Sequence, residues 1–193
     1  MASKRYVIVG GGMTAHAAAQ GIRELDPTGT ITMIGAEEHP PYARPPLSKA
    51  LWKGQAEDSV WLAPVAELKL LSGRRVLSID RKAHRVADDR GEAHVYDKLL
   101  IATGGTPRRL PFRGDRIVYF RTVDDYRRLR RSGRRAVVIG GGFIGSEIAA
   151  ALSIDGREVT MVFASKTPPA RAGIDPMNAL IDRKPDDNLV RVE

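Results

Sequence analysis

The chain has 193 residues, 42% of them hydrophobic, which is enough to bury one sizeable core and part of a second. It contains no cysteine, so disulfide bonds, thiolate metal sites and a redox-active cysteine pair are excluded. Its formal net charge of +8 includes an arginine cluster over residues 127–135. We interpret this cluster as a solvated helix face and loop. Nucleic-acid binding is the alternative, but no aromatic side chains interleave the arginines as a stacking surface requires.

The first residues, Met1 to Arg5, lead directly into an apolar strand, so no signal peptide is apparent. The longest mainly apolar run, residues 136–154, contains Glu147 and several glycines, which argues against a membrane span. We therefore expect a soluble, cytoplasmic protein.

Residues 5–34 predict a parallel, right-handed βαβ unit that binds a dinucleotide. Gly10 allows a tight turn, Gly12 lets the backbone approach a pyrophosphate, and Ala15 lets the helix pack closely on the strand. The start of the helix then offers unpaired N–H groups to the phosphates. The predicted elements are a strand over 5–9, a helix over 13–25 and a strand over 31–34.

An acidic side chain after the second strand of such a unit usually accepts hydrogen bonds from the adenosine ribose. Glu37 or Glu38 can fill that role here. For either residue alone, a surface carboxylate without a ligand is the alternative.

The middle of the chain alternates loops with short elements. A proline-rich crossing, residues 40–46, leads into a short helix near 48–52. Residues 99–103 predict another buried strand, which ends in a turn at Gly104. Further short strands are predicted over residues 68–71, 76–80, 85–88 and 94–96.

A second βαβ unit is predicted over about 135–163, after a connector over 108–121 and a helix over 124–131. Gly140, Gly142 and Gly145 stand where the first unit has Gly10, Gly12 and Ala15. Two such fingerprints, each between a strand and a helix, indicate that one protein binds two nucleotides.

No acidic residue follows the last strand of this unit. Lys166 stands there instead and suits a 2′-phosphate, which favours NADPH over NADH. From residue 164 the sequence contains prolines and charges without periodicity, so we predict an irregular or disordered tail over 164–193.

Residues 5–163 resemble the pyridine-nucleotide-dependent FAD oxidoreductases, in the branch of apoptosis-inducing factor and the bacterial ferredoxin reductases. The resemblance rests on residues 41–49 (PYARPPLSK), 100–108 (LIATGGTPR) and 140–147 (GGGFIGSE), with Arg121-Thr122. It implies an α/β fold. The resemblance implies a Rossmann-like FAD-binding domain over residues 1–122 and a partial Rossmann-like NAD(P)-binding domain over 123–163, followed by a tail over 164–193 that is unlike the family.

The resemblance also implies a reaction, in which hydride passes from NAD(P)H to FAD and electrons pass to an external ferredoxin, quinone or small molecule. Lys49 is then a catalytic residue near the reactive edge of the flavin, and Glu147 pairs with it across the domain crevice. Phe143 lies against the nicotinamide or the isoalloxazine. The remaining implied FAD contacts are Arg44, Thr103, Gly104 and Arg121.

Without the resemblance, Lys49 is an ordinary surface lysine, and Glu147 is a carboxylate favoured near a helix N-terminus. The absence of cysteine excludes the disulfide reductases within the wider superfamily.

The family pattern stops early. Nothing after residue 164 supplies the further strands of either domain, so strand 99–103 should keep a bare apolar edge and the second domain only two strands. We therefore expect a truncated or frame-shifted product whose family-like part ends near Phe163. An inactive nucleotide-binding fragment is the alternative to a working oxidoreductase. Dimerisation is not carried over from the family.

Overall fold

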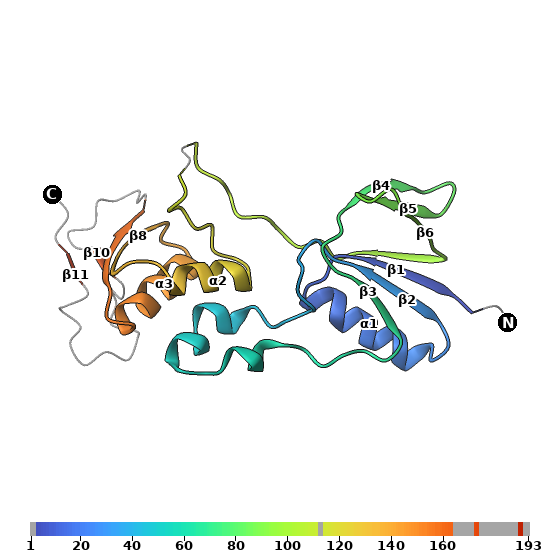
Figure 1. The fold of residues 1–193 in the computed structure, drawn as a ribbon, viewed down its shortest axis with the longest axis horizontal. Helices are drawn as coiled ribbons and strands as arrows, with labels where there is room; N and C mark the ends of the chain where they lie inside the picture. The colour runs from blue at the N-terminus through green and yellow to red at the C-terminus, as the bar shows by residue number, and fades with distance from the viewer. Residues whose placement is uncertain (1–2, 112–113, 164–171, 174–188, 191–193) are drawn as a thin grey trace. The chain divides into compact units, whose positions relative to one another are not determined.

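The computed structural model describes residues 3–111, 114–163, 172–173 and 189–190 (Figure 1). The chain divides into two compact units. The first consists of Met1–Ala43 and Asp58–Thr106, and the second of Arg44–Glu57 and Pro107–Glu193. This division differs from the predicted boundary after residue 122, because residues 44–57 and 107–122 join the second unit. The assignment of domains to nucleotides stays a prediction.

The first unit is built on a four-stranded parallel sheet in the order β3-β2-β1-β7. Its strands are β1 (Arg5–Val9), β2 (Thr30–Ile34), β3 (Leu68–Leu71) and β7 (Lys98–Ile101). The helix α1 (Met13–Leu25) joins β1 to β2, as the βαβ pattern predicts. The α/β, Rossmann-like fold class is therefore confirmed.

Both faces of this sheet are covered (Figure 1). Ile8 points to the face under α1, where Ala15 and Ala19 are fully buried against it. Its neighbours Val7 and Val9 point the other way, because successive side chains of a strand alternate between faces. They pack against an antiparallel sheet of β4 (Val76–Asp80), β5 (Arg85–Asp88) and β6 (Ala93–Val95).

The strand β7 corrects one prediction. We expected a buried strand over residues 99–103, but β7 ends at Ile101 and lies at the edge of the sheet, paired with β1. Leu99 and Leu100 are only half-buried, and Ile101 is 61% exposed. The physical reason is that an edge strand has a neighbour on one side only. The expectation of an exposed apolar edge here agrees with the structure.

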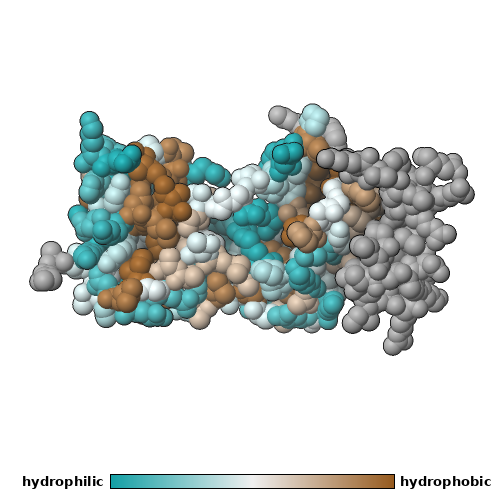
Figure 2. Space-filling model, turned by 180° about the vertical axis from the view of Figure 1, so that it is seen from behind, coloured by the Kyte–Doolittle hydropathy of each residue, from teal (hydrophilic) through white to brown (hydrophobic). Residues whose placement is uncertain are grey.

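The second unit contains β8 (Arg135–Ile139) and β9 (Glu158–Val162), which pair in parallel and are joined by α3 (Phe143–Ile154). The helix α2 (Val123–Arg130) precedes them, and the Thr122 hydroxyl caps it by accepting the N–H of Asp125. On the sheet, Val137, Ile139 and Val162 are each more than half exposed. Apolar surface is plainly visible on the described part of the chain (Figure 2).

Residues 45–60 form three 3₁₀ turns, η1 (Pro45–Ser48), η2 (Ala50–Lys53) and η3 (Glu57–Val60), where one short helix was predicted near 48–52. At the other end, β10 (Ala172–Gly173) pairs with β11 (Leu189–Val190). The rest of the tail, for which irregular structure was predicted, lies outside the described residues. No helix in the described ranges is long and apolar enough to cross a membrane.

Candidate functional site

The turn between β1 and α1 has the backbone geometry that its glycines permit. Gly10 has φ +127°, and a Cβ there would lie 2.1 Å from the carbonyl oxygen of Ala102. Gly12 is the N-cap of α1 and contributes no capping side chain, while Ala15, in the first turn of α1, is fully buried. The turn therefore passes against the end of β7, and only glycine fits at position 10.

Thr103 and Gly104 follow β7, at the same edge of the sheet as the turn between β1 and α1. A Cβ at position 10 would lie 3.2 Å from the backbone nitrogen of Thr103. Gly104 has φ +68°, and both residues are exposed. The structure thus brings together Gly10, Thr103 and Gly104 at the carboxyl ends of parallel strands, where α/β proteins bind ligands.

The two acidic candidates after β2 differ in their surroundings. The Tyr42 hydroxyl donates a 2.5 Å hydrogen bond to Oε2 of Glu37, which is half-buried. The Glu38 side chain is exposed and lies over Gly73, where a Cβ would come within 2.3 Å of its Oε1. Glu37 is therefore the carboxylate that the fold holds in a fixed orientation.

In the second unit, the turn between β8 and α3 repeats two features of the turn between β1 and α1: a glycine with positive φ and a glycine N-cap. Gly140 has φ +114°, and Gly142 is the N-cap of α3 with open space around the position of a Cβ. At Gly145 a Cβ would lie 2.0 Å from the carbonyl oxygen of Gly140. Phe143, at the start of the helix, is 90% exposed. The glycine at 145 serves packing, whereas the glycine at 142 leaves room for a ligand.

Lys49 and Glu147 meet inside this unit. The Lys49 Nζ lies 2.7 Å from Glu147 Oε2, and the Ser48 hydroxyl donates to the same oxygen at 2.6 Å. Burial raises the pKa of Glu147, but the hydrogen bonds from Lys49 and Ser48 and the charge of Lys49 outweigh it. The pKa of Glu147 therefore lies below its ordinary value. The carboxylate is ionised at neutral pH.

Arg44 and Arg121 are also brought together. The Arg44 guanidinium donates from Nη1 to the backbone carbonyl of Arg121 at 3.1 Å. This contact links the start of the 44–57 segment to the residue that precedes the N-cap of α2.

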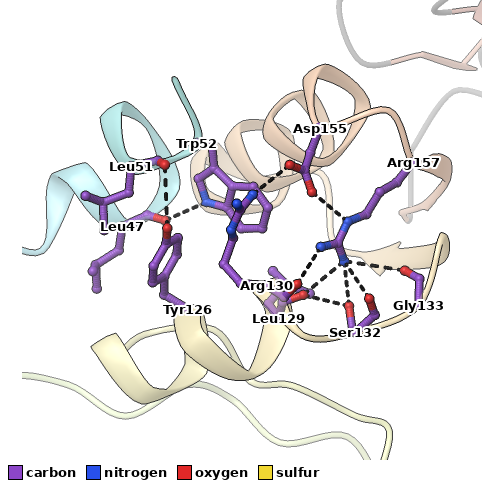
Figure 3. A network of polar contacts seen from close by, with 10 residues as sticks. All are labelled: Leu47, Leu51, Trp52, Tyr126, Leu129, Arg130, Ser132, Gly133, Asp155 and Arg157. Atoms are coloured by element: carbon purple, nitrogen blue, oxygen red, sulfur yellow. Dashed lines mark hydrogen bonds and ion pairs between the residues drawn. The ribbon is translucent and has the colours of Figure 1, made fainter. Parts of the chain in front are cut away.

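An aromatic contact anchors the segment that contains Lys49 (Figure 3). The Trp52 indole donates from Nε1 to the carbonyl of Leu47 at 2.8 Å, which ties η2 to η1. The Tyr126 ring from α2 meets the Trp52 ring edge-on, with centroids 5.5 Å apart. Trp52, Tyr126 and Leu47 are all buried. The segment is thus packed onto α2.

Two arginines complete this anchor. The guanidinium carbons of Arg130 and Arg157 lie 5.1 and 5.8 Å from the centroid of the Trp52 ring. Asp155 accepts from both guanidinium groups, at 2.6 Å from Arg130 and 2.9 Å from Arg157 (Figure 3). Arg157 also donates to the C-terminal end of α2, through the carbonyls of Leu129, Arg130, Ser132 and Gly133.

The arginine cluster therefore has protein partners. Besides the Arg130 contacts, Arg127 forms ion pairs with Glu57 at 2.6 Å and with Asp124 at 3.1 Å. Arg127 and Arg130 thus form contacts within the protein, and the interpretation of the whole cluster as a solvated helix face and loop stays a prediction.

One group of possible metal ligands occurs in the described part of the chain, formed by Asp88, Glu92 and His94. Arg74 forms ion pairs with both carboxylates of this group, and His94 lies 3.1 Å from Asp88. The Arg74 guanidinium already supplies the positive charge that these carboxylates need.

Sequence reasoning missed Ser48, Tyr42 and Trp52 as functional neighbours. Ser48 and Tyr42 stand within the 41–49 block, next to residues that were assigned roles, so the block itself was the available signal. For Trp52 the local pattern predicted a short helix near 48–52 and gave no sign of its partners on α2. Lys166, the candidate for a 2′-phosphate, lies outside the described residues.

The chain is similar to known proteins over most of its length. The model of the family "Pyridine nucleotide-disulphide oxidoreductase" matches residues 4–182, a range that extends into the tail. The ferredoxin–NAD(+) reductase component of the anthranilate 1,2-dioxygenase system of Burkholderia cepacia is 41% identical over 174 residues, which are 84% of this chain and 43% of the relative. Apoptosis-inducing factor 1 of Dictyostelium discoideum is 34% identical over 77% of this chain and 33% of its own length.

Among solved structures, the covalent putidaredoxin reductase–putidaredoxin complex matches with a TM-score of 0.74 and 36% identity, over 83% of this chain and 42% of that chain. This chain thus spans less than half the length of these relatives. The relatives belong to the ferredoxin-reductase and apoptosis-inducing-factor branch that the sequence blocks indicated. The chain is therefore a member of the pyridine nucleotide-disulphide oxidoreductase family.

Proposed function

We propose that this chain binds FAD in its first unit and a nicotinamide nucleotide in its second, as part of an oxidoreductase that passes electrons to an external acceptor. The family and its ferredoxin-reductase members use FAD and NAD(P)H. The observation that supports the proposal best is the pairing of Lys49 with Glu147 in a chain that has two glycine turns of dinucleotide-binding geometry.

The residues of the first unit fit an FAD molecule. Gly10 and Gly12 place no side chain at the start of α1, where backbone N–H groups favour a pyrophosphate. Glu37, oriented by Tyr42, accepts hydrogen bonds from the adenosine ribose. Thr103 and Gly104 line the carboxyl end of β7 beside this turn.

The residues of the second unit fit a nicotinamide nucleotide in the same way. The space at Gly142 admits a pyrophosphate to the start of α3, and Gly145 keeps that helix close to its turn. Phe143 presents an exposed ring at the first position of α3, where it can stack on a planar nucleotide ring.

Lys49 is the residue that we assign to the reacting groups, with Arg44 and Arg121 as further FAD contacts. When bound, FAD supplies the isoalloxazine ring that accepts a hydride from the nicotinamide. The Lys49 ammonium, 52% exposed, stabilises negative charge on a ligand beside it, and Glu147 balances that charge in the resting protein.

The acceptor belongs to the same proposal. The relatives include ferredoxin–NAD(+) reductase components, and one solved relative is covalently joined to putidaredoxin. A ferredoxin-like electron carrier is therefore the acceptor class that we propose first, before a quinone or a small molecule.

The test begins with the visible absorption spectrum of the purified chain and identification of any released flavin. We expect stoichiometric FAD, retained on purification or taken up when FAD is added. The matched variant Glu37→Gln keeps an oxygen for Tyr42 but loses the charge, and it should weaken FAD binding about tenfold. A chain that fails to bind added FAD contradicts the proposal.

Turnover is tested next, as NAD(P)H-driven dye reduction with added FAD. A rate above that of free flavin supports oxidoreductase activity. Bound FAD without such a rate selects the alternative, a nucleotide-binding chain that does not transfer hydride.

A further inference from the structure

The Glu147 carboxylate is held by two donors of different kinds on one oxygen. Ser48 Oγ lies 2.6 Å and Lys49 Nζ 2.7 Å from Oε2. The Ser48 residue is only 4% exposed, whereas the Lys49 side chain is 52% exposed. Ser48 is therefore a short, buried donor, and Lys49 is a long, largely solvated one.

The backbone explains how two consecutive side chains reach the same atom. Lys49 separates the turns η1 and η2, with φ −129° and ψ −93°. Its N–H donates to the carbonyl of Pro46 at 3.1 Å, and its own carbonyl accepts the N–H of Trp52 at 3.1 Å. This bend, tied down by Trp52, turns Ser48 and Lys49 toward one carboxylate.

The two donors can act separately. A serine hydroxyl on a buried turn has one side-chain torsion to fix, while a lysine loses far more conformational freedom when its ammonium is held. If the Lys49 ammonium moved to another anion, the Glu147 carboxylate would keep the hydrogen bond that the Ser48 hydroxyl donates. A partly buried carboxylate without any donor is costly, so this second donor matters.

We infer that Ser48 is a positioning residue for the Lys49–Glu147 pair: its hydroxyl holds the Glu147 carboxylate in place without help from Lys49, which frees Lys49 to move to a bound anionic ligand. The identity of that ligand rests on the proposed function. The hold of Ser48 on Glu147 does not, and it can be measured in the protein without any nucleotide.

The experiment follows the titration of the Glu147 carboxyl by NMR in the cofactor-free chain, with isotope-labelled glutamate and Glu147→Gln to assign the signal. We expect Ser48→Ala to lower the acid dissociation constant of the Glu147 carboxyl about tenfold, because a hydrogen bond to a charged group is lost. Lys49→Met should lower this constant as well. Ser48→Ala in the Lys49→Met background should lower the constant further by a similar factor.

Two further variants separate this role from general damage. Ser146→Ala removes a hydroxyl from the residue beside Glu147 on α3 and should leave the titration unchanged. Ser48→Thr keeps the hydroxyl, so the Glu147 carboxyl of this variant should titrate as in the wild-type chain. Circular dichroism checks that each variant is folded.

The inference is overturned if Ser48→Ala leaves the Glu147 titration where it was. It is also overturned if the effect of Ser48→Ala disappears once Lys49 is replaced, because Ser48 would then act only through the lysine. A failure to bind FAD would contradict the proposed function and leave both of these results unaffected.

Discussion

The Lys49 ammonium and the Glu147 carboxylate form their ion pair within a single compact unit, since residues 44–57 belong to the same unit as α3. The segment that contains Lys49 is fixed there by its own contacts, through Trp52 to α2 and through Arg127 to Glu57. The pair is thus a property of the second unit, and it can be studied separately from the glycine turn of the first.

Replacement of Lys49 should separate cofactor binding from hydride transfer. In Lys49→Ala we expect FAD to be retained, because the turn at Gly10 and the Glu37 carboxylate are untouched. The rate of flavin reduction by NAD(P)H should fall at least about tenfold, since an ammonium near developing negative charge contributes more than about 1.4 kcal/mol. Rapid-mixing absorbance and retained flavin give the two readouts.

Lys53→Ala is the matched control, because Lys53 is an exposed lysine at the end of η2, the turn that begins directly after Lys49. It should change neither quantity. An equal loss of FAD retention and reduction rate in Lys49→Ala would contradict the role assigned to Lys49.

Two glycines of the second turn should respond differently to alanine. In Gly145→Ala the new Cβ would lie 2.0 Å from the Gly140 carbonyl, so the helix must move and the unit should lose stability, by about 1–3 kcal/mol. In Gly142→Ala the Cβ meets open space, so the loss should stay near about 1 kcal/mol for a poorer N-cap.

For nucleotide affinity we expect the larger effect from the other substitution, Gly142→Ala. We expect Gly142→Ala to weaken binding of the nicotinamide nucleotide at least about tenfold while the protein remains folded, because the Cβ occupies the approach to α3. Calorimetric titration and urea unfolding of both variants make the comparison. Unchanged affinity in a folded Gly142→Ala variant would show that no pyrophosphate lies there.

The sequence predicted most elements of the fold because they depend on local pattern. The glycine turns, α1, α3 and the strands around them follow from β-branched runs and helical periodicity. The bounds predicted for β1, α1 and β2 agree to within one residue. The contacts of Ser48 with Glu147 and of Trp52 with Tyr126 join segments far apart in the chain. No local pattern encodes them, and the paired 3₁₀ turns that make them possible have little periodicity. The burial of β7 was predicted wrongly for a similar reason, since the same apolar run fits a central or an edge strand.

Arg157 should be important for the stability of the second unit. Its side chain is 8% exposed, and its guanidinium binds Asp155, the end of α2 and the face of Trp52. In Arg157→Lys the charge remains but the planar fork is lost, so several carbonyls lose their donor. We expect a loss on the order of 2–3 kcal/mol in the free energy of unfolding, measured by urea denaturation. The exposed Arg134, changed to lysine, should cost far less, and equal losses would refute the assignment.

The buried Asp88 should make the stability of the first unit dependent on pH in the acid range. Its side chain is fully buried, 3.1 Å from His94 and 2.9 Å from Arg74, and it accepts the backbone N–H groups of Arg90 and Glu92. The hydrogen bond from His94 lowers the pKa of Asp88, and the hydrogen bonds from Glu92, Arg74 and Arg90 lower it further against the opposing effect of burial.

Because the folded pKa of Asp88 lies below the unfolded value of about 4, its contribution to stability is complete above that pH and is lost as the pH falls toward the folded pKa. Urea unfolding between about pH 2 and pH 6 should therefore show stability falling below about pH 4 in the wild-type chain. Asp88→Asn keeps the shape but removes the titrating group, so its stability should be lower at neutral pH and should depend less on pH in this range. The exposed neighbour Asp89, changed to asparagine, should keep the wild-type pH dependence. If Asp88→Asn kept that dependence too, the acid sensitivity would have to come from other carboxylates.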